Sequence, residues 1–259
     1  MRMMKKVLGT VTVLALSVSL LAGCGSTAVS PVSSTASTAA ESTTSSVVSE
    51  TTSAAADENA AAAAQLLNDL TGSYQELWPV ILADEYQQTW LDDCTALVGE
   101  ENAEAAFEKL SSMVTSDVYG EDAVEAYANG GGAYFCGFTN SLATLTFDGE
   151  TSTISGTDKD GNVLFSHTYH YIGMEPVRGL YEFQSDDADS GEFTYFFLAP
   201  DTSAETYHIE FRYGSDAEAL SQYDTGEYAY WLASGISTDC DQTMIDNCIE
   251  LFCTENLAG

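Results

Sequence analysis

The sequence predicts an α+β domain, mainly β, in which an antiparallel β-barrel carries N-terminal helices and a C-terminal helix. Three observations indicate this fold class. Apolar residues recur at helical spacing in the first third of the domain, short alternating segments rich in aromatic and β-branched residues follow between positions 133 and 213, and helical spacing returns near the end. Short strands separated by regular turn signals are typical of antiparallel barrels and sandwiches.

Residues 1–23 have the three-part order of a secretory signal. Three basic residues precede an apolar run from Val7 to Leu21, and a Leu-Ala-Gly-Cys sequence ends at Cys24. The apolar run is too short for a retained membrane span and is followed by a processing site. We therefore expect cleavage before Cys24 and acylation of its thiol, so that the mature protein is an extracytoplasmic lipoprotein anchored to the cell membrane.

The segment 24–57 has a composition that does not support a packed core. It consists largely of Ser, Thr, Ala and Val and contains scarcely any aromatic residue. Such a chain buries too little apolar surface to offset its loss of conformational entropy on ordering. We expect a disordered stalk that separates the lipid anchor from a single domain over residues 58–259, which is long enough for one full core.

The charge balance is strongly acidic. The chain has 7 basic and 40 acidic residues, and removal of residues 1–23 leaves 4 basic residues and a net charge of −36. A surface of this sign repels phosphate backbones and anionic lipid headgroups, which excludes nucleic acid as a partner and leaves the acyl chain as the link to the membrane. The same surface attracts divalent metal ions.

Helical periodicity predicts three helices at the start of the domain. Apolar residues recur about every 3.6 positions over 61–67, 74–91 and 101–113. The glycine triplet at 130–132 lacks the Lys and Ser/Thr of a phosphate-binding loop, and we interpret it as a hinge between the helical and the strand-rich halves.

Turn signals then divide the chain into short strands. Asp148-Gly149 and Asp160-Gly161 each follow a strand-like segment and predict hairpins. Seven or so strands are expected between Ala133 and Tyr213.

The C-terminal segment predicts a capped helix. The stretch from Thr238 to Asp241 has the residue types of a helix start, and Ile245, Cys248 and Ile249 begin an apolar face on which Cys248 points to the core. Acylation of Cys24 would leave an odd number of thiols, so at least one stays free, and the sequence does not give a pairing. The five remaining cysteines are Cys94, Cys136, Cys240, Cys248 and Cys253.

The strand-like segment 207–213 places three polar side chains on one face. His208, Glu210 and Arg212 alternate with apolar or aromatic residues that occupy the other face. An imidazole and a carboxylate two residues apart in a strand can reach one ion, which predicts a candidate metal site at His208 and Glu210.

This segment resembles the end of the ZinT/YodA family of extracytoplasmic zinc-binding proteins. The resemblance rests on His-Ile-Glu-Phe-Arg-Tyr-Gly at 208–214, the preceding Leu-Ala-Pro at 198–200, the stretch YDTGEYAYWLASGI at 223–236 and Trp78, and it extends from Leu66 to the C-terminus. Against the family pattern, His208 matches the first His of a His-x-His pair, and Glu210 and Phe196 stand where further ligand histidines are found. The resemblance implies a lipocalin-like barrel, zinc as the bound ion and a metal ABC importer as partner.

Two further histidines complete the predicted zinc site. His167 and His170 lie in a strand-like segment, where a separation of three places them on opposite faces. Zinc takes three or four ligands, and we expect His208 and Glu210 to be joined by His167 or His170 from a neighbouring strand.

Two alternatives to zinc capture remain from the sequence. One is a lipocalin-like module that holds a small ligand among its aromatic side chains, and the other is a surface adhesion module whose metal site has been lost. We expect no catalysis, because the chain has neither a Gly-x-Ser-x-Gly nor a His-Glu-x-x-His motif. The carboxylate pairs Asp92-Asp93 and Asp186-Asp187 are adjacent in sequence, and we interpret them as solvated residues.

Overall fold

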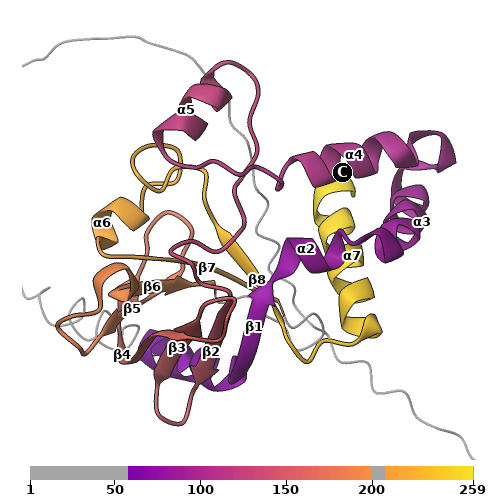
Figure 1. Cartoon of the computed structure of the whole chain (residues 1–259). Helices are drawn as coiled ribbons and strands as arrows, with labels where there is room; N and C mark the ends of the chain where they lie inside the picture. The colour runs from indigo at the N-terminus through magenta and orange to yellow at the C-terminus, as the bar shows by residue number, and fades with distance from the viewer. Residues whose placement is uncertain (1–57, 200–207, 259) are drawn as a thin grey trace, which may run out of the picture. The chain divides into compact units, whose positions relative to one another are not determined.

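The computed structural model describes residues 58–199 and 208–258, all within one compact unit. The predicted signal sequence, Cys24 and the stalk lie outside these residues. Figure 1 shows a barrel of short strands, with α2, α3, α4 and α7 gathered beside it. The strands are β1 (Gly72–Glu76), β2 (Thr144–Asp148), β3 (Thr153–Thr157), β4 (Val163–Met174), β5 (Tyr181–Ser185), β6 (Tyr195–Leu198), β7 (His208–Gly214) and β8 (Ala233–Ser237).

The eight strands form a closed antiparallel barrel in sequence order, which confirms the predicted fold class. Each strand pairs with the next along the chain, and β1 pairs with β8 to close the barrel, with Tyr74 opposite Ser237. Six strands lie between Ala133 and Tyr213, where we expected about seven. The first and last strands lie outside that segment.

Both predicted hairpins are present. The turn at Asp148-Gly149 joins β2 to β3, and the turn around Asp160-Gly161 joins β3 to β4, where the Asp158 carboxylate accepts the backbone N–H groups of Asp160 and Asn162. Gly149 also allows this end of the barrel to contact the helix over residues 58–69, because a Cβ atom there would lie 2.4 Å from the Cα of Asn68.

The remaining helices agree with the prediction in part. The helix over residues 58–69 and the one over 103–112 fall where periodicity placed them, whereas the expected helix over 74–91 is wrong at its start. The helices are α2 (Leu77–Ile81), α3 (Gln87–Val98), α4 (Ala103–Ser112), α5 (Glu121–Ala128), α6 (Ala217–Leu220) and α7 (Gln242–Leu257).

Tyr74 belongs to strand β1 rather than to a helix. Its buried ring meets Phe147 of β2 edge-on, with the ring centroids 5.7 Å apart. A helix in this place would leave β2 and β8 with unpaired edges, so barrel closure overrides the local apolar spacing.

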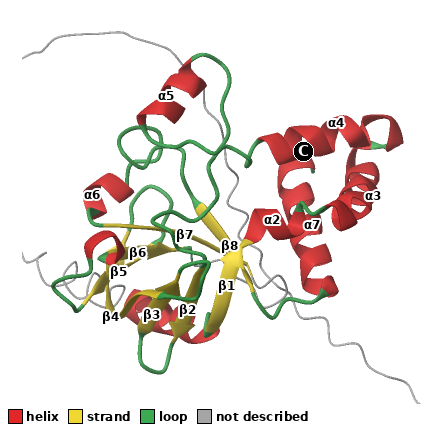
Figure 2. Ribbon diagram, viewed as in Figure 1, coloured by secondary structure: helices red, strands yellow, loops and turns green. Residues whose placement is uncertain are grey.

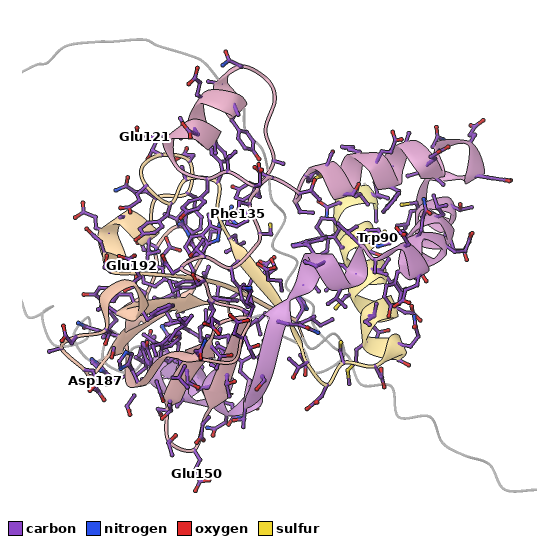
Figure 3. All side chains as sticks on the ribbon, viewed as in Figure 1. Trp90, Glu121, Phe135, Glu150, Asp187 and Glu192 are labelled. Carbon is purple, nitrogen blue, oxygen red and sulfur yellow. The ribbon has the colours of Figure 1, made fainter. Side chains whose placement is uncertain are left out.

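Two hydrophobic cores stabilise the domain. One fills the barrel with aromatic side chains, and the other lies among α2, α3, α4 and α7, the group of helices beside the strands in Figure 2. Trp90 belongs to this second core (Figure 3). The predicted C-terminal helix is confirmed: the Asp241 carboxylate caps it by accepting the Met244 N–H at 3.0 Å, and Cys248 is buried in the second core. Within the described part of the chain, no helix has the length and apolar character of a membrane span.

Candidate metal site

Strand β7 presents its polar and apolar side chains on opposite faces, as the alternation predicts. Ile209, Phe211 and Tyr213 are buried in the barrel core, and His208 and Glu210 on the other face are half-buried. The aromatic face anchors β7 against the core. The strand is therefore a firm support for the two candidate ligands on its outer side.

The outer face of β7 continues onto β8 and the loop before β2. Glu210 stands opposite Ser234, whose N–H donates to the carbonyl of Cys136 at 3.0 Å. Burial, reinforced by the negative charge of Glu210, raises the pKa of the Cys136 thiol to about 12. Cys136 is therefore a protonated thiol at neutral pH, and it would have to lose this proton before it could bind a metal.

Arg212 ends the polar face of β7 in a buried cationic cluster. Its guanidinium donates to the backbone carbonyls of Leu220, Gln222 and Tyr228 and lies over the Tyr223 ring, with its Cζ 4.4 Å from the ring centroid. Arg178 lies at the same 4.4 Å distance from that ring. These contacts hold the segment between β7 and β8, and they place positive charge at the end of the face remote from His208.

A buried carboxylate completes this cluster. Glu175 is fully buried and accepts the N–H groups of Val177 at 2.6 Å and Arg178 at 2.7 Å. The Tyr223 hydroxyl lies 3.3 Å from its Oε2. The carboxylate is thus engaged by two backbone N–H groups and lies within reach of the Tyr223 hydroxyl.

The two histidines of β4 lie on opposite faces of their strand and each meets an aspartate. His167 Nδ1 is 2.7 Å from Asp187 Oδ2, and His170 Nδ1 is 2.6 Å from Asp186 Oδ1. The His167 side chain is 18 % exposed and stands with the core-facing residues, whereas that of His170 is 52 % exposed. Asp187 marks this loop in Figure 3.

Asp186 and Asp187 thus have roles that we did not predict. We interpreted them as solvated, and both are half-exposed, but their side chains diverge and reach the two faces of β4. The sequence contained a signal for this arrangement. Two adjacent aspartates in an extended segment point to opposite sides, and so do two histidines three positions apart in a strand. The pairing of β4 with β5 was needed to connect the two pairs.

The predicted neighbouring strand for His208 is wrong. β7 pairs with β6 and β8, and both β5 and β6 separate it from β4. His167 and His170 are therefore not on a strand beside the His208–Glu210 pair. Among residues 58–199 and 208–258, no three His, Cys, Asp or Glu side chains are grouped closely enough to hold a metal ion.

The predicted donors on β7 are too few for most protein zinc sites. An imidazole and a carboxylate suit zinc chemically, but two protein ligands are fewer than the three or four of most zinc sites. The described residues therefore do not supply a closed zinc site.

Aromatic side chains fill the barrel interior. Phe165 and Phe193 stack with their centroids 3.9 Å apart, and Phe196 and Tyr213 follow at 5.3 Å. Phe196, Phe211 and Tyr213 are fully buried. This packing leaves the interior as a core, and it disfavours the alternative in which the barrel holds a small ligand.

Comparison with known proteins gives structural likeness only. No family model matches the chain, and no curated protein matches it in sequence. The solved Zn(II)-bound ZinT-like domain of Streptococcus pneumoniae AdcA is similar at a TM-score of 0.45 and 15 % identity, over 71 % of this chain and 89 % of that one. Zn(II)-bound AdcA from the same organism gives 0.42 and 14 %, over 72 % and 35 %. At these identities the likeness concerns the fold.

Proposed function

We propose that this protein captures a divalent metal ion, zinc first, outside the cytoplasm, and that His208 and Glu210 of β7 are its ligands. One observation carries the proposal: both side chains lie on the same outer face of a strand that is anchored in the core, and both are half-buried. The resemblance of residues 208–214 to the ZinT/YodA pattern supports the same two positions. The role proposed is binding rather than catalysis.

The proposed site should bind its ion weakly, because the protein supplies only two of the three or four donors that zinc usually takes. Water or a group from outside the described residues would complete the coordination, and a carboxylate in place of an imidazole reduces selectivity for zinc. Weak capture suits a protein that passes its ion on, and we propose a metal ABC importer as the recipient. The net charge of −36 expected for the mature chain would raise the local concentration of cations.

Replacing His208 tests the proposal. His208→Ala should lower zinc affinity by at least about tenfold, because it removes the only imidazole predicted on this face. The measurement is a competition titration with a chromophoric chelator at about 0.15 M salt, where binding to exposed carboxylates is screened. Zinc affinity of the wild type should also fall below about pH 6.5, because only a neutral imidazole binds a metal.

His170→Ala is the matched control. It removes an imidazole from the outer face of another strand, where the partner is Asp186, and it should leave zinc affinity unchanged. Equal affinity in wild type and His208→Ala would remove His208 from the site. The preferred alternative would then be a surface adhesion module whose metal site has been lost, because the filled barrel interior disfavours ligand capture.

Anchoring is a separate proposal that rests on Cys24. We expect Cys24→Ser to prevent acylation, so that the chain is either released or retained with its signal uncleaved. Membrane fractionation together with fatty-acid labelling measures both effects. Unchanged membrane attachment and normal processing in the variant would contradict a lipid anchor at this residue.

A further inference from the structure

Two cysteines from distant parts of the chain meet in the helical core. Cys94 of α3 and Cys253 of α7 are both fully buried, and their Sγ atoms are 3.9 Å apart. They are 159 positions apart in sequence, with seven of the eight barrel strands between them. The two helices pack side by side, and Trp90, one turn before Cys94, lies between them and contacts Phe252 of α7 (Figure 3).

We propose that Cys94 and Cys253 form a disulfide when the chain meets an oxidant of the disulfide class. In this exchange one protein thiolate attacks the oxidant, the second displaces it, and the two protein thiols are oxidised as the oxidant is reduced to two thiols. Two protons leave the protein with the two electrons. This proposal rests on the proposed export of the protein, because the compartments outside the cytoplasm are oxidising and supply such oxidants.

The geometry requires only a small movement. A disulfide has an S–S distance of about 2.05 Å, so the two sulfurs must approach by roughly 2 Å, a shift within the reach of χ1 rotations and a slight adjustment of one helix. Cys253 lies one turn before the C-terminal end of α7 at Leu257. Helices fray at their ends, so a small adjustment is easiest there. The Asp241 cap at the other end keeps α7 in register during this adjustment.

Burial decides when the bond forms. Loss of hydration raises the pKa of both thiols, most strongly that of Cys253, so the reactive thiolate is scarce in the folded reduced protein. Oxidation is therefore expected while the chain is folding, or on opening of the last turn of α7. One bridge is also compatible with an odd number of thiols, because an odd number cannot be joined entirely in pairs.

Peptide mapping of the purified full chain tests the proposal. The denatured, reduced chain is refolded in a glutathione redox mixture or in dithiothreitol, free thiols are alkylated, and the digest is analysed without reduction. We expect one linked peptide containing Cys94 and Cys253 in the glutathione sample. Its formation should raise Tm by about 10 °C over the reduced sample, because it closes a very long loop.

Variants separate this pair from the other thiols. The oxidant-dependent rise in Tm should disappear in Cys94→Ala and persist in Cys248→Ala, which removes another buried thiol from α7. Peptide mapping of the wild type tests the proposal even if a variant folds poorly. If Cys94 and Cys253 are both alkylated in the oxidised sample, or are linked to other cysteines, the proposal is overturned. Neither export nor zinc enters this experiment, so its failure is distinguishable from failure of the proposed function.

Discussion

Arg212→Ala should lower the free energy of unfolding by about 3–5 kcal/mol, because it removes the centre of a buried polar network. The wild-type guanidinium is fully buried and donates to the carbonyls of Leu220, Gln222 and Tyr228, while its Nε has no hydrogen-bond partner within the described structure. Burial lowers the pKa of Arg212 to about 10, which still leaves it charged at neutral pH. Alanine would leave a cavity lined by carbonyls without donors.

Urea denaturation measures this loss, and two substitutions bracket it. Arg178→Ala removes a half-buried guanidinium at the same 4.4 Å from the Tyr223 ring and should cost about 1 kcal/mol or less. Arg212→Lys keeps the charge but not the planar fork that reaches several carbonyls, so its stability should fall between Arg212→Ala and wild type. A loss below about 1.5 kcal/mol in Arg212→Ala would show that other contacts hold the segment between β7 and β8.

Trp90→Ala should be comparably severe, with a loss of about 3–5 kcal/mol. Trp90 is fully buried and connects α3 to three other helices. Its Nε1 donates to the Ile81 carbonyl of α2 at 2.7 Å, and its ring meets Phe107 of α4 and Phe252 of α7, with ring centroids 5.6 and 6.0 Å apart. Removal of the indole leaves a large void and an unpaired carbonyl at the end of α2.

Trp90→Phe is the control, since it keeps an aromatic ring and loses the donor. It should cost about 1–2 kcal/mol. Chemical denaturation, monitored by near-UV circular dichroism, measures the loss of stability in both variants. A fully cooperative transition with wild-type stability in Trp90→Ala would contradict the role assigned to this residue in the helical core.

Local patterns predicted those parts of the fold that depend on neighbours in sequence. The C-terminal helix, both hairpins and the two faces of β7 follow from spacing and turn residues over ten or so positions. β1 and β8 were missed for different reasons. Apolar residues such as Trp78 and Ile81 continue a helical pattern across β1, and β8 has the sequence Ala-Ser-Gly-Ile-Ser, which is buried on both faces and does not alternate.

The candidate site likewise has features that depend on neighbours in sequence and features that depend on distant parts of the chain. The common face of His208 and Glu210 is local and was predictable, whereas the distance from β7 to β4 depends on strand order around the barrel. The His–Asp pairs depend on the loop after β5 folding back over β4, a non-local contact that no spacing encodes.

Closure of the barrel by its first and last strands also constrains when the domain can fold. Strand β1 can pair with β8 only after residues 233–237 have been synthesised, and α7 follows even later. Such long-range pairing is slow, because the entropy of ordering most of the chain must be lost before the closing contacts form. The barrel of such a chain can therefore close only after nearly the whole domain has been synthesised.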